Sequence, residues 1–387
     1  MAFRFEVLAT DPSGARLGRL ETPHGVIETP AFMPVGTLGT VKGLTQESLE
    51  ALGAQIILAN TYHLYLRPGA ELIREMGGLH KFMAWPHPIL TDSGGYQVFS
   101  LSDLRRVTDD GVAFRSHIDG SEHFLSPERA IEIQLALGSD IMMVLDECIE
   151  ASSNEERAAA AAARTLDWAK RSIAYFSEHG DAQRQMMFGI VQGGAHADLR
   201  RGCADEMVAL DFPGYAIGGL AVGEAHEVTC EMTAHVTSLL PLDRPRYLMG
   251  VGRPEQIADY VARGVDMMDC VLPTRSARHG CLFTWHGRIL IKNACYARDP
   301  RPIDPACQCP TCRRYSRAYL RHLFLSKELL GATLTTLHNV YFYLDIMAEI
   351  RKSIRFGNLV GFCSDLQARL ENNVPESGAA SGTKLNR

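Results

Sequence analysis

Short runs of consecutive apolar residues recur along this chain, each ending in small or polar residues and followed by helix-like sequence. The eight runs are AFMPVG (31–36), IILANTYH (56–63), PILTDSGG (88–95), IMMVLDEC (141–148), MFGIVQGG (187–194), YAIGGLAVGE (215–224), RYLMGVG (246–252) and VDMMDCVLPTR (265–275). Continuous apolar strands of this length are typical of parallel sheets that are buried on both faces. Their alternation with helices predicts an α/β fold, a (β/α)8 TIM barrel. A doubly wound sheet is the alternative, because strand order cannot be read from the pattern.

Several segments between these runs carry signals for the start of a helix. Ser126-Pro127 places a capping residue and a first-position proline before ERAIEIQLALG. Ser153 and Glu156 have the spacing of a capping box at the start of an alanine-rich helix. Because (β/α)8 barrels keep their active sites at the carboxyl ends of the strands, we expect the polar residues that end the eight runs to converge on one face.

Two regions interrupt this alternation. Residues 100–125 contain VAFRSHIDGSEHFL, in which two alternating runs flank Asp119-Gly120 and predict a β-hairpin. Residues 281–325 combine short strand-like runs with a cluster of cysteines.

The cysteine cluster is Cys307, Cys309 and Cys312, a C-x-C-x2-C pattern within six residues. Ten cysteines in 387 residues are too few for a disulfide scaffold. Three closely spaced thiols favour a soft metal in a tetrahedral site, and we expect zinc. The fourth ligand must come from elsewhere, and His322 and His338 are the nearest candidates downstream. A site filled entirely by protein ligands would be structural.

These patterns predict four parts of the chain. They are a barrel bearing the active site (1–280), an inserted zinc-binding subdomain (281–340), a helical segment packing on the barrel (341–370) and a disordered tail (371–387).

Charge is distributed unevenly. The net charge is −6, which alone argues against a nucleic-acid partner. Between residues 270 and 330, however, eleven Lys and Arg residues face only three acids, so this stretch can attract a phosphate backbone. A solvated helix face is the alternative. No apolar run approaches the roughly 18 residues of a membrane helix, and the charged start is no secretory signal, so a cytoplasmic location is expected.

Polar residues at the ends of four predicted strands are candidates for chemistry. Asp92 precedes Ser-Gly-Gly and is either a functional acid or a helix cap. Asp146 ends a very apolar run, where a carboxylate can accept hydrogen bonds from a donor-rich ring edge such as that of guanine. Gln192 offers an amide donor and acceptor, and Gly218-Gly219 present bare backbone groups.

Asp269 ends the last run, in MMDCVLPTR. A carboxylate placed opposite another can act as the nucleophile in substitution at a sugar carbon. An ion pair with Arg275 is the alternative. Tyr96 and Met249 are the apolar strand tips next to these acids, where they would either enclose a flat base or pack at the barrel mouth.

The segments TDSGGYQ, LDEC, QGG, GGLAVGE, YLMGVG, DCVLPTR, C-x-C-x2-C and LHN occur in an order that closely resembles the tRNA-guanine transglycosylase family, from about Val26 to about Asn339. The resemblance implies a (β/α)8 barrel with a zinc subdomain. It also implies exchange of the wobble guanine of tRNAs with G-U-N anticodons through a covalent aspartyl intermediate.

By this resemblance, Asp269 matches the nucleophile and Asp92 the general acid/base. The residues that match base-recognition groups are Asp146, Gln192, Gly219 and Leu220, with Tyr96 and Met249 stacking on the ring. Arg275 and Arg278 match residues that contact the anticodon loop. The zinc ligands match Cys307, Cys309, Cys312 and His338.

Cys148 and Val222 resemble the bacterial type, which inserts free 7-aminomethyl-7-deazaguanine, and the resemblance implies a homodimer. The chain departs from the bacterial pattern at IEASS (149–153), where a Pro-Tyr-Pro-like loop is usual. A non-catalytic RNA-binding partner subunit is the alternative function. Loss of either Asp92 or Asp269 would indicate such a subunit, and both are present. His63 and Glu224 are expected only to support neighbouring groups.

Overall fold

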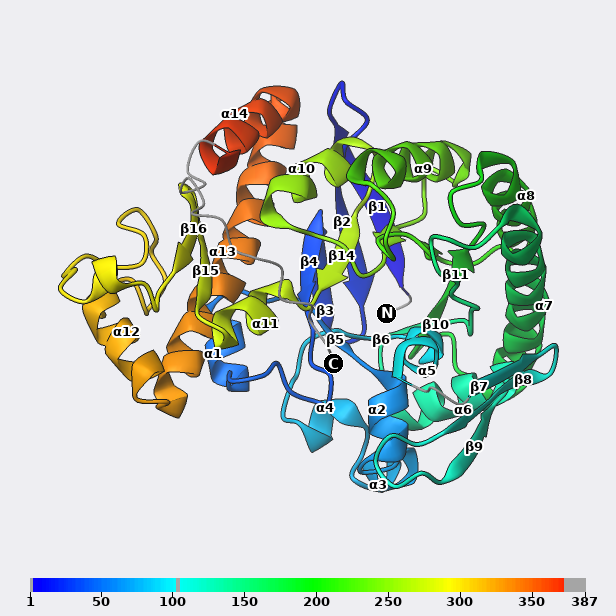
Figure 1. The fold of residues 1–387 in the computed structure, drawn as a ribbon. Coiled ribbons are helices and arrows are strands. Elements are labelled where there is room, and N and C mark those ends of the chain that lie inside the picture. Colours follow the sequence, from blue (N-terminus) through cyan, green and yellow to red (C-terminus); the bar gives the residue numbers. More distant parts are fainter. Residues whose placement is uncertain (1–2, 102–104, 372–387) are drawn as a thin grey trace.

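A computed structural model describes residues 3–101 and 105–371 of the chain. Its centre is a parallel sheet of eight strands in the order β4-β14-β13-β12-β11-β10-β6-β5 (Figure 1). A bridge between Val35 and Leu58 joins the two ends of this order. The barrel strands are β4 (Ala31–Pro34), β5 (Ile57–Ala59), β6 (Ile89–Thr91), β10 (Ile141–Met143), β11 (Met186–Val191), β12 (Tyr215–Ile217), β13 (Arg246–Leu248) and β14 (Met267–Cys270). Each of the eight apolar runs contributes one strand, and the predicted (β/α)8 barrel is confirmed.

Helices surround the barrel (Figure 1). The described helices are α1 (Gln46–Ala51), α2 (Thr61–Leu66), α3 (Ala70–Glu75), α4 (Leu79–Phe82), α5 (Gly95–Leu101), α6 (Pro127–Leu137), α7 (Glu155–His179), α8 (Ala197–Ala209), α9 (His226–Leu239), α10 (Pro254–Ala262), α11 (Leu272–Arg278), α12 (Arg317–Leu325), α13 (Leu329–Arg355) and α14 (Leu359–Glu371). Within the described ranges, none of them has the length and hydrophobicity needed to cross a membrane.

The helix starts can be compared with the sequence signals. Ser126 caps α6 by accepting the N–H of Arg129, as predicted. The predicted capping box at Ser153 is wrong by one residue, because Asn154 caps α7 and accepts the N–H of Arg157. The N–H of Ser153 instead closes a turn onto the carbonyl of Glu150, which leaves Ser153 outside the helix.

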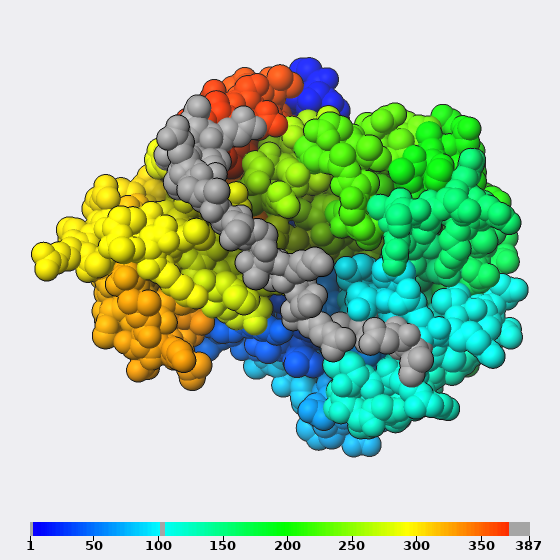
Figure 2. All heavy atoms as spheres, in the orientation of Figure 1, coloured from blue at the N-terminus to red at the C-terminus, as the bar shows by residue number. Residues whose placement is uncertain are grey.

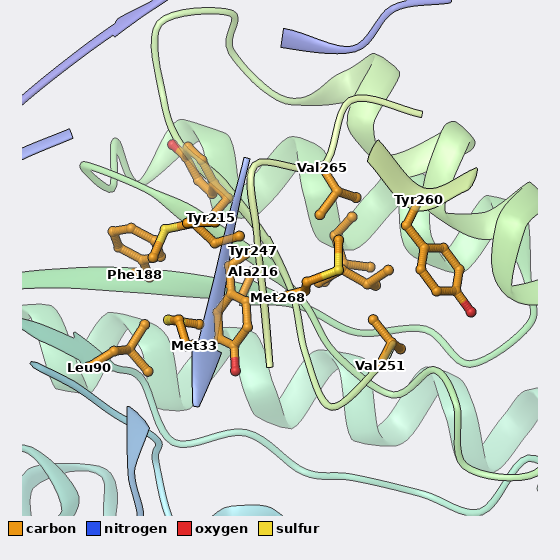
Figure 3. Close-up of a cluster of buried hydrophobic side chains, with 14 of the residues drawn as sticks. Met33, Leu90, Phe188, Tyr215, Ala216, Tyr247, Val251, Tyr260, Val265 and Met268 are labelled. Carbon is orange, nitrogen blue, oxygen red and sulfur yellow. The ribbon is translucent and has the colours of Figure 1, made fainter. Parts of the chain in front are cut away.

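The core lies between the barrel strands and their covering helices. Figure 3 shows side chains from several barrel strands packed in one cluster, among them Met33, Leu90, Phe188, Tyr247 and Met268. All five are at most 1% exposed. Burial of this apolar surface is the main stabilising contribution to the fold, and it leaves only the strand ends free for polar chemistry.

Three smaller antiparallel sheets accompany the barrel. Their strands are β1 (Arg4–Thr10), β2 (Arg16–Thr22) and β3 (Gly25–Thr29); β7 (Arg105–Thr108), β8 (Gly111–Arg115) and β9 (Glu122–Leu125); and β15 (Cys281–Thr284) with β16 (Gly287–Leu290). The β8–β9 pair confirms the hairpin predicted around Asp119-Gly120. The 3-10 helix Ala294–Tyr296, the β15–β16 pair and α12 project to one side of the barrel (Figures 1 and 2).

Asp140 ties three segments together at the amino-terminal end of β10. One of its carboxylate oxygens lies 2.8 Å from Nδ1 of His24 and the other 3.1 Å from Nε2 of His80. The two imidazole rings stack with their centroids 3.6 Å apart. These contacts link the β2–β3 turn and α4 to the barrel, at the opposite end from the strand tips described next.

Candidate active site and metal centre

Five of the predicted site residues lie at or just beyond the carboxyl ends of barrel strands. Asp92 follows β6, Asp146 follows β10, Gln192 follows β11, Gly219 follows β12, and Asp269 lies in β14. Because all eight strands are parallel, these ends open onto the same face of the barrel. The structure therefore gathers residues that are up to 177 positions apart in the sequence.

Asp92 is buried and is surrounded by hydrogen-bond donors. Its carboxylate accepts the N–H of Thr61 at 2.8 Å and the Nε2 of Gln97 at 2.8 Å, together with the Nδ2 of Asn60. Burial raises the pKa of Asp92 to about 6, and the nearby charge of Asp269 adds to this, while the three donors oppose it. Asp92 therefore changes protonation close to neutral pH. Among the hydrogen bonds of the described residues, its carboxylate accepts no backbone N–H of α5; the backbone N–H that it accepts belongs to Thr61, the first residue of α2.

The raised pKa predicts a pH effect on stability. An acid whose pKa is higher in the folded state than the unfolded value near 3.8 binds more protons when folded between about pH 4 and pH 6. The free energy of unfolding should therefore fall by up to about 3 kcal/mol as the pH rises through this window, and stay reduced above it. We expect the free energy of unfolding of Asp92→Asn to lack this fall between about pH 4 and pH 6. Denaturant unfolding of both proteins between pH 3.5 and 7.5 measures it, and parallel curves would contradict the prediction.

Asp146 is held by donors from two neighbouring strand ends. Ser93 donates to it at 2.9 Å and the Nε2 of Gln192 at 2.7 Å. Cys148 contributes a longer contact of 3.5 Å from its thiol. Burial raises the pKa of Asp146, and these hydrogen bonds oppose the rise. Within the described residues, the Oε1 of Gln192 is buried without a hydrogen-bond partner, so this amide can still accept a bond from a ligand.

The turn after β12 brings backbone close to that amide. Gly219 has a φ of +64°, and a Cβ at this position would lie 2.2 Å from the Oε1 of Gln192. A side chain here would therefore meet both backbone strain and a steric clash. Leu220 follows with its side chain buried. Glu224 supports the same turn by accepting the N–H of Val222 at 3.1 Å and the hydroxyl of Thr229 at 2.7 Å.

Asp269 is fixed by two donors from β13 and the residues after it. The hydroxyl of Tyr247 donates to Oδ1 at 2.6 Å, and the N–H of Gly250 donates to the same oxygen at 2.8 Å. Burial raises the pKa of Asp269, and these bonds oppose the rise. Its other oxygen, Oδ2, accepts no hydrogen bond from the described residues. The alternative ion pair with Arg275 does not form in the described structure.

The remaining predicted residues surround this acidic centre. Tyr96 in α5 is 50% exposed, and Met249 at the end of β13 is half-buried. In α11, Arg275 is exposed and Arg278 is half-buried, with its Nε bound to the carbonyl of Thr274. His63 is half-buried, and its burial together with the charges of nearby His117 and Lys42 lowers its pKa to about 4.

A cleft of about 550 Å³ opens beside Asp269. It is bounded by the segments that follow β12, β13 and β14, and its lining includes Ala221, Glu224, Gly250, Arg253, Val271 and Leu272. Gly250 belongs both to this lining and to the pair of donors that holds Asp269. The cleft therefore lies next to Asp269, although the side chains of the three acids are not part of its lining.

Six residues that hydrogen-bond to the acids were not predicted as site residues: Asn60, Thr61, Ser93, Gln97, Tyr247 and Gly250. All but Gln97 fall within the apolar runs, in NTYH, TDSGG and YLMG, at strand ends that were expected to face the site. The sequence thus carried a signal for their position. It carried none for their partners, because every contact except the one between Gln97 and Asp92 joins segments that lie in or follow different strands.

The cysteine cluster has the geometry of a metal centre. Cys307, Cys309, Cys312 and His338 are at most 8% exposed, and their ligand atoms lie within 4.8 Å of one another. The Nδ1 of His338 is 3.7, 3.5 and 3.3 Å from the three sulfurs in that order. Bonds of about 2.3 Å to sulfur and 2.1 Å to nitrogen around a tetrahedral ion would give edges of roughly 3.6 Å. The four residues can therefore hold a metal ion.

The orientation of His338 supports this fit. Its Nε2 donates to the carbonyl of Phe283 at 2.7 Å, which leaves Nδ1 free as a ligand. His322, the alternative ligand, is not part of the cluster. On the next position of α13, Asn339 accepts the N–H of Phe283 and donates to the carbonyls of Pro273 and Cys281. The metal centre and α11 are therefore fastened to the same helix.

Fold and site together define the class of protein: a barrel enzyme with the buried carboxylates of Asp92, Asp146 and Asp269 at its mouth and a Cys3His cluster that can hold a metal ion. The family model of queuine tRNA-ribosyltransferases matches residues 11–372, and the chain belongs to that family. The predicted enzyme class, a transferase of the tRNA-guanine transglycosylase type, is thereby confirmed.

Similar proteins support this membership. The queuine tRNA-ribosyltransferase of Caldanaerobacter subterraneus is 54% identical over 97% of this chain and 100% of its own length. That of Pelotomaculum thermopropionicum is 55% identical over 96% of this chain and 100% of its own. That of Koribacter versatilis is 55% identical over 92% and 95% respectively.

Proposed function

We propose that this chain exchanges the wobble guanine of G-U-N anticodon tRNAs for 7-aminomethyl-7-deazaguanine by two displacements at the same ribose carbon. The observation that carries the proposal is the set of three buried carboxylates, Asp92, Asp146 and Asp269, each with different hydrogen-bond partners at one barrel mouth. Separate environments allow separate roles for the same functional group.

Asp269 is the nucleophile of this scheme. Tyr247 and Gly250 hold its Oδ1, so Oδ2 is free to attack C1′ of the ribose. The C1′–N9 bond breaks as the C1′–O bond forms, and guanine departs. The incoming base then attacks C1′ and releases the carboxylate. Two inversions retain the configuration, and one glycosidic bond replaces another without an energy source.

Asp92 moves the proton in both steps. In its acid form it protonates the departing guanine, and the resulting carboxylate takes the proton from the incoming base. A pKa of about 6 suits this double use, since both forms are accessible near neutral pH.

Asp146, Gln192 and the turn at Gly219-Leu220 recognise the base. The carboxylate of Asp146 accepts from the N1–H and the exocyclic amine, while amide donors of Gln192 and the backbone face the 6-oxo group. Tyr96 and Met249 remain accessible enough to cover the two faces of a flat ring.

The RNA chain extends from this centre. A base inside an anticodon loop must leave its stack to be reached, and Arg275 and Arg278 are placed on α11 to bind the phosphates of the loop. The cleft beside Asp269 has room for a neighbouring nucleotide.

The proposed homodimer needs an apolar surface, and α12 and α13 offer one in the exposed side chains of Tyr319, Leu325 and Leu329. The cytoplasm, where tRNA is found, is the proposed location.

We assign zinc to the Cys3His centre, as a structural ion that supplies no step of the reaction. The proposed parts of the chain are the barrel (1–280), the zinc subdomain (281–340) and the segment that packs on the barrel (341–370). In the structure, α13 runs through residue 340 and links the last two. Residues 372–387 of the proposed tail lie outside the described residues.

Substitution of one thiol tests the zinc assignment. We expect Cys309→Ser to reduce bound zinc from about one ion per chain to a small fraction and to lower the melting temperature, because structural zinc contributes binding energy to folding. Cys295→Ser is the matched control, since Cys295 is exposed and outside the cluster. Elemental analysis and thermal unfolding supply the readout. Equal zinc content in the two variants would exclude Cys309 as a ligand.

The function itself is tested by incorporation of labelled guanine into unmodified tRNA. We expect label to enter a tRNA with a G-U-N anticodon, and not the same tRNA with adenine at the wobble position. Pre-incubation with 7-aminomethyl-7-deazaguanine should then block guanine entry, because the inserted base is no longer displaced. A folded, zinc-loaded protein that incorporates no label would favour the non-catalytic partner subunit.

A further inference from the structure

Arg200 lies beneath the base-recognition turns and has a role that the proposed reaction does not yet use. It belongs to α8, is 0% exposed, and extends its guanidinium under the ends of β11 and β12. In the described structure no carboxylate forms an ion pair with it. Burial lowers its pKa to about 10, so it remains a cation at neutral pH.

All of its hydrogen bonds in the described structure go to backbone carbonyls of the two turns. Nε donates to the carbonyl of Gly194 at 2.6 Å, and Nη1 makes a longer contact of 3.4 Å with that of Val191. Nη2 donates to the carbonyls of Gly218 and Gly219, at 3.0 and 3.3 Å. One side chain thus joins the turn that carries Gln192 to the turn that carries Gly219.

These bonds fix the direction of two peptide groups. In a trans peptide the C=O and the N–H point in opposite directions. Because Arg200 holds the carbonyls of Gly218 and Gly219, the N–H groups of Gly219 and Leu220 point away from it. Neither N–H donates to another described residue. Backbone donors left free in a buried turn are costly unless a ligand completes them.

The position of Gln192 shows which groups lie next to these donors. Its side-chain amide lies against both glycines, since a Cβ on Gly218 would be 2.8 Å from its Nε2 and one on Gly219 would be 2.2 Å from its Oε1. The same Nε2 donates to Asp146. The free N–H groups therefore belong to the same recognition surface as Gln192 and Asp146.

We propose that Arg200 is a positioning residue for base binding, which turns the N–H groups of Gly219 and Leu220 into fixed donors for the 6-oxo group of a purine or deazapurine. This inference rests on the proposed function and deepens it. Arg200 does not touch the base; it acts through the two peptide groups. Its cationic charge also strengthens these donors by polarising the carbonyls it binds.

Equilibrium dialysis with labelled guanine tests the proposal without requiring turnover. We expect the Kd of guanine to rise roughly 10- to 100-fold in Arg200→Gln, because the misplaced N–H groups no longer donate hydrogen bonds to the 6-oxo group of the base. The rise should be smaller in Arg200→Lys, which keeps a charged donor. Arg201→Gln is the matched control, since Arg201 is the next residue on α8 and is exposed. Affinity for tRNA, measured by gel shift, should stay within about twofold because phosphate contacts dominate it.

A second probe separates positioning from a general loss of structure. In 6-thioguanine a weaker acceptor replaces the oxo group, while N1–H and the amine remain. The wild type should prefer guanine, and this preference should fall towards unity in Arg200→Gln. An unchanged preference, an unchanged Kd for guanine, or loss of cooperative unfolding in both Arg200 variants would overturn the proposal.

These outcomes are distinguishable from failure of the proposed function. Wild-type protein that binds guanine but transfers none to tRNA would remove the transglycosylase proposal, while the dialysis result still decides the role of Arg200. Wild-type protein that binds no guanine would overturn both.

Discussion

Replacing Asp269 by Asn is expected to reduce guanine exchange by roughly 10⁴-fold or more, the scale seen when a catalytic nucleophile is removed. An amide keeps the size of the side chain and can still accept the hydrogen bonds that Tyr247 and Gly250 donate to Oδ1. The amide lacks the negatively charged carboxylate oxygen that must attack C1′. The variant should therefore fold and bind tRNA while failing to form the covalent intermediate.

A denaturing gel gives the direct measurement. Wild-type protein incubated with tRNA, without competing base, should yield a band of the covalent protein–tRNA complex that survives denaturation. Asp269→Asn should yield no such band. Asp243→Asn controls for the loss of a carboxylate, because that side chain is 73% exposed, near the amino-terminal end of β13. If Asp269→Asn retained both the band and the exchange, the nucleophile would have to be another group, with Asp92 the next candidate.

Replacing Asp92 by Asn should slow exchange by about 10²- to 10⁴-fold, the usual contribution of a positioned acid or base. The variant retains its nucleophile, but the departing guanine receives no proton and the incoming base loses none. Rapid-quench measurement of guanine release isolates the first of these steps. Tight binding of tRNA should persist, since Asp92 is buried at the barrel mouth and is not one of the proposed phosphate contacts, Arg275 and Arg278.

The pH profile distinguishes proton transfer from a merely structural effect of this substitution. In the wild type, guanine release needs the protonated form, so kcat/KM for tRNA should decline as the pH rises above about 6. The residual activity of Asp92→Asn should lack this decline. A variant that is slow but keeps the wild-type profile would show that another group carries the proton.

The sequence predicted the barrel because its signal is local. Each of the eight strands is a run of buried apolar residues, and the acids at their ends interrupt that pattern conspicuously. Asp92, Asp146 and Asp269 could be singled out for this reason, and the spacing of Cys307 and Cys312 identified the metal centre in the same way.

What the sequence could not show depends on contacts between distant elements. The bond from Tyr247 to Asp269 and those from Arg200 to Gly218 and Gly219 exist only after strands and helices have packed together. The N-terminal sheet β1–β3 was not predicted, because its strands intersperse charged and apolar residues and lack a continuous apolar run. The one-residue error at Asn154 reflects the equal capping ability of serine and asparagine.

Helix α13 links the metal centre to α11, and this link affects which parts of the site depend on the metal. His338 belongs to the metal centre, and Asn339 beside it fastens the carbonyls of Pro273 and Cys281 that flank α11. The barrel acids are held by separate contacts that involve none of these residues. On the proposed assignments, a chain made without zinc would therefore keep its acidic centre assembled, while α11, which carries Arg275 and Arg278, would lose part of its support.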